Sequence, residues 1–182
     1  MLPSLIANNK TALCVSSFSN FLFFFLSLGL ADLNIASYAN SDSPNIQSPQ
    51  YLPLEAQWCL KSGSCLLLEI ANTDEEKRIG LMQRSSLPIG TGMWFRFFPR
   101  QPVRFWMYKT LIPLDMIFIS KGIIVSIETN LKVCHSSPCA KYGPNQLVDG
   151  VIEIGAGEVD RLAISVGDIV SIEPIIIPLR VK

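Results

Sequence analysis

The sequence predicts an α+β domain made mostly of antiparallel β-strands, in a partial barrel-like sheet with two short helices. Two observations support this fold class. Between residues 51 and 178, short apolar and aromatic runs are separated by turn residues at close spacing, which is typical of a β-rich fold. Only two segments of this region carry helix signals, and both are short. The region contains no internal repeat, so we expect a single hydrophobic core.

The first elements are a hairpin and a helix. Residues 55–60 and 65–71 form two strands around a three-residue loop, with Gly63 at the position that needs a left-handed backbone. Thr73 and Glu76 then have the spacing of a capping box, which predicts that a helix begins there. We expect Ile79 and Met82 to form its buried face, and Lys77, Arg78 and Arg84 to be solvated.

The remaining elements alternate strands and turns. We expect strands at 93–98 and 103–108, separated by the segment 99–102 with its two prolines, and a tight hairpin of strands 114–120 and 123–128. A loop with its own cysteines spans 131–142, a strand follows at 148–154, a short helix at 156–163 and a last strand at 169–173.

The N-terminal segment resembles a secretion signal. Residues 21–30 form an apolar run of about 15 Å as a helix, which is too short to span a bilayer but suits a signal peptide. Ser37-Tyr38-Ala39 is a suitable cleavage site, so we expect a signal peptide at 1–39, a disordered linker at 40–50 and a tail at 179–182. The alternative is an anchor that is not cut. In either case we expect the protein to be exported to a periplasm, the extracellular space or a lumen, and to meet a membrane only through this N-terminal segment.

Charge argues against nucleic-acid binding. The chain has 15 basic and 15 acidic residues. Removing residues 1–39 takes out Lys10 and Asp32, which leaves 14 of each and no net positive field to attract phosphates.

Four cysteines lie in two local pairs. Cys59 and Cys65 flank the predicted hairpin loop, and Cys134 and Cys139 enclose a short loop. In an exported domain this arrangement favours two disulfides. One alternative is free thiols. The other is a metal site formed by Cys134, His135 and Cys139, but such a site lacks a fourth protein ligand. We therefore expect no metal and no cofactor.

A second group of residues forms the candidate ligand-binding site. Trp106, Met107 and Thr110 precede Asp115, which lies in an apolar run where a carboxylate needs hydrogen bonds or a charged partner. Asp115 is either a ligand-binding or acid–base group, or a structural acceptor of backbone N–H groups. Glu153 is a second carboxyl in an apolar strand, and Met82 is a candidate wall of an adaptable cavity.

An ordered set of short motifs resembles a known family. The motifs are Gly80-Leu81-Met82, Gly92-Met93, Phe105-Trp106-Met107, Thr110, Ile112-Pro113-Leu114-Asp115, Ile152-Glu153 with Gly157, and Val166-Gly167-Asp168. From Leu54 to Pro174 the chain resembles domain of unknown function 192, and the cysteine loop resembles its exported cyanobacterial members. The family pattern has Lys-Asn where this chain has Tyr108-Lys109. The resemblance implies a compact β-rich fold and no assigned reaction.

These observations predict a binding function. The leading hypothesis is an exported, non-catalytic binding or accessory envelope module that holds a saccharide or peptide end near Trp106, Thr110 and Asp115. Its partner is then a small molecule or an envelope protein. The alternatives are a small hydrolase or transferase that uses Asp115 and Glu153, and a structural envelope protein.

Overall fold

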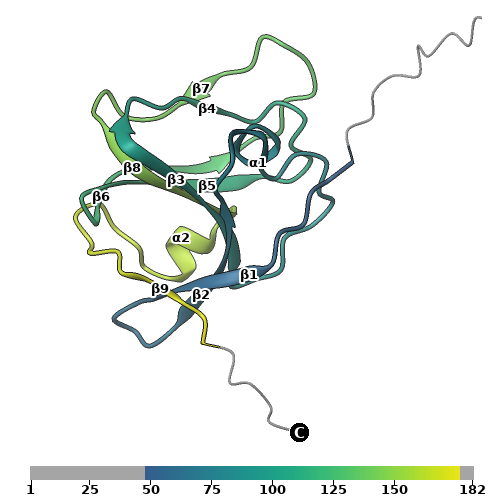
Figure 1. Ribbon diagram of the computed structural model, residues 1–182. Coiled ribbons are helices and arrows are strands. Elements are labelled where there is room, and N and C mark those ends of the chain that lie inside the picture. Colours follow the sequence, from purple (N-terminus) through teal and green to yellow (C-terminus); the bar gives the residue numbers. More distant parts are fainter. Residues whose placement is uncertain (1–47, 177–182) are drawn as a thin grey trace, which may run out of the picture. The chain divides into compact units, whose positions relative to one another are not determined.

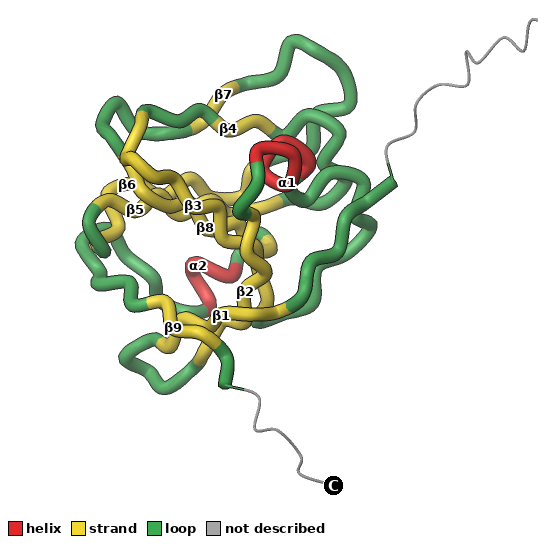
Figure 2. Tube along the Cα trace, viewed as in Figure 1, coloured by secondary structure: helices red, strands yellow, loops and turns green. Residues whose placement is uncertain are grey.

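The computed structural model describes residues 48–176, and most of their regular secondary structure is β-strand (Figures 1 and 2). The elements are β1 Leu54–Cys59, β2 Cys65–Ala71, α1 Asp74–Ile79, β3 Thr91–Gln101, β4 Phe105–Trp106, β5 Leu114–Ser120, β6 Ile123–Leu131, β7 Lys141–Tyr142, β8 Val148–Gly155, α2 Glu158–Arg161 and β9 Ile172–Pro174. The predicted signal peptide at 1–39 lies outside these residues, as does the tail at 179–182. Within the described part of the chain, no helix is long and apolar enough to cross a membrane.

One mixed sheet organises the domain. Its strand order is β6-β5-β8-β3-β2-β1-β9, and β4 and β7 form a separate pair. Only β2 and β3 are parallel within the large sheet, because α1 connects them as a crossover. The expected α+β class, mostly antiparallel with two short helices, is confirmed.

The sheet curls but is not closed into a barrel. The segment before β9 runs between the two edges of the sheet: Val170 N–H donates to the carbonyl of Gly122 (2.9 Å), beside β6, while β9 itself pairs with β1. The curl surrounds α2, as Figure 1 shows.

Apolar side chains pack on both faces of the sheet. The core inside the curl includes Trp58, Leu66 and Ile152, together with Val159 and Leu162 from α2 and the residues after it. The second core lies on the opposite face, where α1 and the β4–β7 pair cover the sheet (Figure 1). It is built from large side chains of β3, β5 and β8 and of the loops above them: Leu81, Met93, Phe95, Met107, Met116, Phe118 and Val151.

Local signals in the sequence predicted the local structure well. Leu60 N–H donates to the carbonyl of Ser64 (2.8 Å), and Gly63 has a φ of 88°, as the hairpin loop requires. Thr73 and Glu76 form the expected capping box at α1. Cys59 is bonded to Cys65 and Cys134 to Cys139, which confirms two disulfides and excludes a metal bound through their thiolates.

Several predicted element bounds differ from those of the structure, including those of β3, β4 and α1. β3 continues through Pro99 to Gln101, because its register with β8 breaks after Arg96 and the missing proline N–H is not needed there. The second aromatic strand shrinks to Phe105–Trp106. Helix α1 itself contains no buried residue, so Met82 is buried only after the helix has ended.

Arg84 is the clearest error, because it is buried and not solvated. Its side chain is 2% exposed and makes a bidentate ion pair with Glu69 of β2. Nη1 donates to Oε1 (2.7 Å) and Nη2 donates to Oε2 (2.6 Å). The Arg84 Nε also donates to the carbonyl of Gln50 (2.9 Å), and Glu69 accepts the N–H of Leu52 (2.7 Å).

Gln50 extends this network to α1. It was expected to belong to the disordered linker at 40–50, but its side-chain amide donates to the carbonyls of Glu76 (2.8 Å) and Gly80 (2.9 Å). One buried cation therefore connects β2, the chain before β1 and the end of α1.

Replacing Arg84 should destabilise the fold strongly. Arg84→Met leaves the Glu69 carboxylate buried without its cation, so we expect a loss of about 3–5 kcal/mol in the free energy of unfolding, measured by urea denaturation. Arg78→Met is the matched control, since Arg78 pairs with Glu75 at the surface. A loss that is no larger for Arg84→Met than for Arg78→Met would contradict this role.

Candidate functional site

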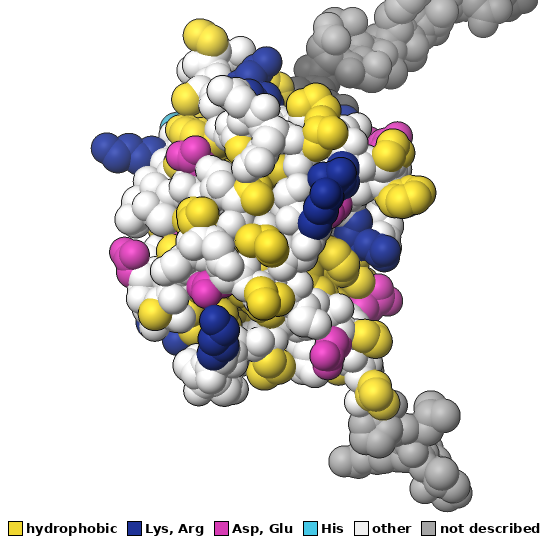
Figure 3. All heavy atoms as spheres, turned by 90° about the vertical axis from the view of Figure 1, so that its left-hand side faces the viewer, with side chains coloured by type: hydrophobic (Ala, Val, Ile, Leu, Met, Phe, Trp, Pro, Cys, Tyr) yellow, Lys and Arg dark blue, Asp and Glu magenta, His cyan; other side chains and the backbone are white. Residues whose placement is uncertain are grey.

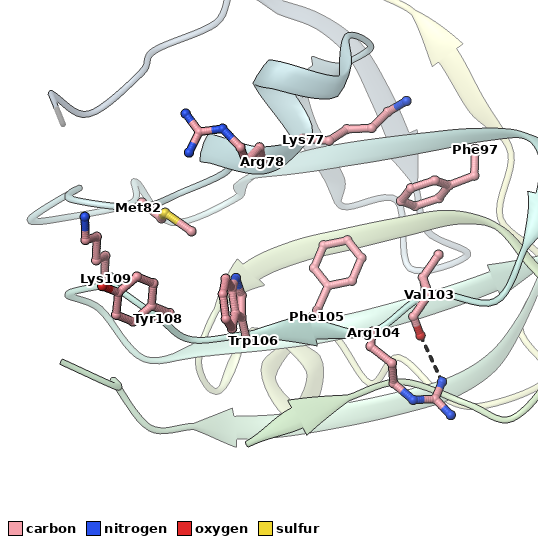
Figure 4. Close-up of a pocket in the computed structure, with 10 residues that line it drawn as sticks. All are labelled: Lys77, Arg78, Met82, Phe97, Val103, Arg104, Phe105, Trp106, Tyr108 and Lys109. Atoms are coloured by element: carbon pink, nitrogen blue, oxygen red, sulfur yellow. Dashed lines mark hydrogen bonds between the residues drawn. The ribbon is translucent and has the colours of Figure 1, made fainter. Parts of the chain in front are cut away.

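A groove lies between α1 and β4, on the face of the sheet opposite α2. Its volume is about 520 Å³. Its lining, shown in Figure 4, consists of Lys77, Arg78, Met82, Phe97, Val103, Arg104, Phe105, Trp106, Tyr108 and Lys109. We call it the apolar groove, because carbon-rich side chains form its wall while cations provide its charged groups.

Strand β4 supplies one wall of the apolar groove. Phe105 packs edge-on against Phe95 (5.0 Å between ring centroids) and Phe118 (6.1 Å), which fastens β4 over the sheet. Trp106 is left 43% exposed beside Tyr108, with 5.2 Å between their ring centroids. Tyr and Trp rings of this kind offer broad contact surfaces to a ligand.

A smaller cavity of about 40 Å³ lies next to the groove. We call it the floor cavity. Its lining includes Lys77, Arg78, Met82, Phe105 and Trp106, which it shares with the groove, and also Ile79, Gly80, Leu81, Phe95, Thr110 and Glu153. The two spaces are therefore adjacent, and the smaller one adds the polar side chains of Thr110 and Glu153 to the site.

Glu153 is the unusual group in the floor cavity. It lies on β8 between Met93 of β3 and Met116 of β5, and it is 5% exposed. Its carboxyl makes no hydrogen bond or ion pair within residues 48–176. Burial raises its pKa to about 8, although the positive charge of Arg84 opposes the rise. At neutral pH the group is therefore mainly the uncharged acid, which can donate a hydrogen bond.

Thr110 has a similar environment. It is 5% exposed, and its backbone N–H donates to the carbonyl of Met107 (3.2 Å). Its hydroxyl has no hydrogen-bond partner among the residues that the structure describes. Two polar side chains at the floor cavity thus retain unused hydrogen-bonding capacity, which is uncommon for buried groups and marks a site for a ligand or water.

Asp115 lies elsewhere. It is fully buried and pairs across strands with Ile154, whereas the neighbouring Met116 pairs with Glu153. Directly opposed residues share a face, so Asp115 and Glu153 point to opposite faces of the sheet. Asp115 accepts the N–H groups of Asn130 (2.8 Å) and Val159 (3.0 Å), which attaches α2 to the sheet.

The two predicted methionines also lie in different places. Met82 lines both the groove and the floor cavity, but Met107 is 1% exposed and belongs to the core beneath them. The carbonyl of Met107 accepts the N–H of Cys134 (3.2 Å), and Lys109 N–H donates to the carbonyl of Cys134 (3.0 Å). The loop closed by the second disulfide therefore supports the wall that carries Trp106.

The sequence did not indicate that α1 would lie across from β4. Lys77 and Arg78 were expected to be solvated; Arg78 is exposed and paired with Glu75, but both side chains also line the groove. Several of the family motifs meet at the floor cavity: Gly80-Leu81-Met82, Phe105-Trp106, Thr110 and Glu153.

Comparison with known families agrees with these motifs. The model of domain of unknown function 192, described as "Uncharacterized ACR", matches residues 59–172. The chain belongs to this family. No relative of the chain was found among curated proteins.

Two solved structures are similar to this member of domain of unknown function 192. One is a candidate transcription regulator from Sinorhizobium meliloti, 33% identical, with a TM-score of 0.58 over 70% of this chain and 98% of that chain. The other is a protein of unknown function from Novosphingobium aromaticivorans, 29% identical, with a TM-score of 0.59 over 70% of this chain and 94% of that chain.

The raised pKa of Glu153 predicts a pH-dependent stability. Between about pH 5 and the folded-state pKa of about 8, the folded protein keeps a proton that the unfolded chain has released. The free energy of unfolding should therefore fall as pH rises through this window, by up to about 1.4 kcal/mol per pH unit.

Urea titrations at several pH values check this. Glu153→Gln should remove the slope, because its amide does not titrate. Glu158→Gln is the matched control: the hydrogen bond from Arg161 lowers the pKa of Glu158, so this group acts only at lower pH. If the free energy of unfolding of Glu153→Gln kept the same pH slope, the raised pKa of Glu153 would be contradicted.

The backbone conformation at Lys109 explains why the family pattern has Asn at this position. Its φ is 57°, a left-handed backbone that Asn adopts more readily than Lys. Lys109→Asn should therefore stabilise the fold by up to about 1 kcal/mol in thermal denaturation. Lys132→Asn is the control, because position 132 is exposed and has no left-handed backbone. Equal effects of the two variants would contradict this explanation.

Proposed function

We propose that this protein is a non-catalytic binding module that holds the end of a peptide in the apolar groove. The observation that carries the proposal is the composition of the groove: aromatic and Met side chains next to Lys77, Arg78, Arg104 and Lys109, with no carboxylate in its lining. A peptide end offers an apolar side chain and a charged terminus, which complement these two kinds of wall.

A saccharide is the second candidate ligand. The indole of Trp106 is 43% exposed at the groove, and an exposed aromatic face of this size can stack on a sugar ring. The cations favour the peptide end, because a neutral sugar makes no use of their charge.

A reaction that uses two carboxylates is less well supported. Asp115 is engaged by two backbone N–H groups on the face opposite Glu153, so the pair does not converge on one substrate. The structural envelope alternative leaves the unpartnered groups of the floor cavity without a purpose.

Charge and disulfides support the proposed setting. The 14 basic and 14 acidic residues after position 39 favour a small ligand over nucleic acid, although one similar structure is a candidate transcription regulator. On the face shown in Figure 3, Lys and Arg side chains are interspersed with Asp and Glu. The two disulfides support export to an oxidising compartment, as proposed from the sequence.

A thermal-shift titration tests the proposal. The probes are N-acetyl-Ala-Phe with a free carboxyl terminus and, separately, maltotriose. At about 100 times its dissociation constant, the peptide should stabilise the domain by about 2.7 kcal/mol, a shift of several degrees in Tm.

Matched variants locate the binding. Trp106→Ala should abolish the peptide shift while the unliganded Tm changes little, because Trp106 is partly exposed. Phe98→Ala should leave the shift intact, since Phe98 is fully exposed on β3 and does not line the groove. A peptide shift that survives Trp106→Ala would place binding elsewhere, and a shift with maltotriose alone would select the saccharide.

A further inference from the structure

The floor cavity contains hydrogen-bonding groups that the fold does not use. Glu153 and Thr110 are each 5% exposed, and neither side chain has a partner among residues 48–176. The cavity measures about 40 Å³, which is the scale of one small polar group or a water molecule. A group that enters from the apolar groove therefore meets unsatisfied polar atoms at its end.

The surroundings of Glu153 are apolar or positive. Its neighbours on β3 and β5 are Met93 and Met116, which carry no charge. Lys77 and Arg78 of α1 line the same cavity, and Arg84 lies close enough for its charge to act on Glu153. No second carboxyl is present in the cavity lining. Arg78 is already paired with Glu75 and Arg84 with Glu69, so Lys77 is the cation of the lining that has no carboxylate partner among residues 48–176.

We propose that the floor cavity is the subsite for a carboxylate of the ligand, so that the peptide end bound in the groove is a C-terminus. The inference rests on the proposed function. Glu153 and Thr110 donate hydrogen bonds to the carboxylate oxygens, and the preceding side chain of the peptide packs against Trp106 and Phe105.

The chemistry of the cavity selects a carboxylate among acceptors. An O–H donor to a carboxylate forms a short, charge-assisted hydrogen bond that is about twice as strong as a neutral one. The amide of a blocked C-terminus has no charge to interact with Lys77 and Arg78. A phosphate carries three free oxygens, and the cavity of about 40 Å³ has space for a smaller group.

Binding should depend on pH, because only the acid form of Glu153 can donate. Above its pKa of about 8 the side chain becomes a carboxylate and repels the ligand. Affinity for the peptide acid should then fall about tenfold per pH unit. Lys and Arg side chains ordinarily titrate above this range, so the neighbouring cations are not expected to produce the effect.

Calorimetric titrations at pH 6 to 9.5 test this inference. The probes are N-acetyl-Ala-Phe and its C-terminal amide. We expect the acid to bind at least tenfold more tightly than the amide at pH 6 and to lose this advantage above pH 8. Glu153→Gln should keep binding of the acid but remove its pH dependence, because an amide N–H also donates at every pH.

Thr110→Val provides a second variant that preserves shape, and it should weaken the acid at least tenfold while leaving the amide unchanged. Glu158→Gln, outside both cavities, should alter neither probe. Equal affinity for acid and amide at all pH values would overturn the carboxylate subsite and leave groove binding intact. Failure of both probes to bind would overturn the proposed function and the subsite together.

Discussion

A single buried cation sets the arrangement on which the rest of the site depends. Arg84 cannot lose its charge, so the fold must supply an anion, and Glu69 of β2 takes both prongs of the guanidinium. Its Nε–H donates to the carbonyl of Gln50. Within residues 48–176 Arg84 makes no hydrogen bond or ion pair with the second carboxyl nearby, Glu153. Since that carboxyl is also buried, it avoids the cost of desolvating a charge by keeping its proton.

The same network positions α1, which forms one wall of the apolar groove. Gln50 joins the ion pair through its carbonyl and the end of α1 through its side-chain amide. Helix α1 has only six residues and none of them is buried, so it has little packing of its own to hold it in place. Its position over the sheet, and hence the position of Lys77 and Arg78 across from Trp106, follows from these polar contacts.

The sheet then separates the two carboxyls that look alike in the sequence. Asp115 and Glu153 both lie in apolar strands, but the alternation of side chains sends them to opposite faces. One face holds α2, whose backbone N–H satisfies Asp115, and the other holds the floor cavity. The sequence could predict that both groups are buried, but which one is satisfied depends on strand register, which involves residues far apart in the chain.

This distinction explains how much the sequence could predict. The hairpin around Gly63, the capping box at Thr73 and both cysteine pairs depend on contacts within a few residues, and all were confirmed. The parallel pairing of β2 with β3 and the ion pair of Arg84 join distant segments, and neither was predicted. Trp106, Thr110, Glu153 and Met82 were singled out as candidate site residues from their chemistry, although the sequence did not show that they meet at one cavity.

Local charge, and not the balanced total, sets the electrostatics of the site. Because Glu153 is neutral at the floor, the charge of Lys77 at the cavity is not cancelled by a buried anion, whereas Arg78 is already paired with Glu75 at the surface. Near a protein surface, such a charge acts on a ligand with less screening than it would in bulk water. A chain with equal numbers of acidic and basic residues can therefore still present a positively charged pocket, provided that the buried carboxyl of Glu153 stays protonated.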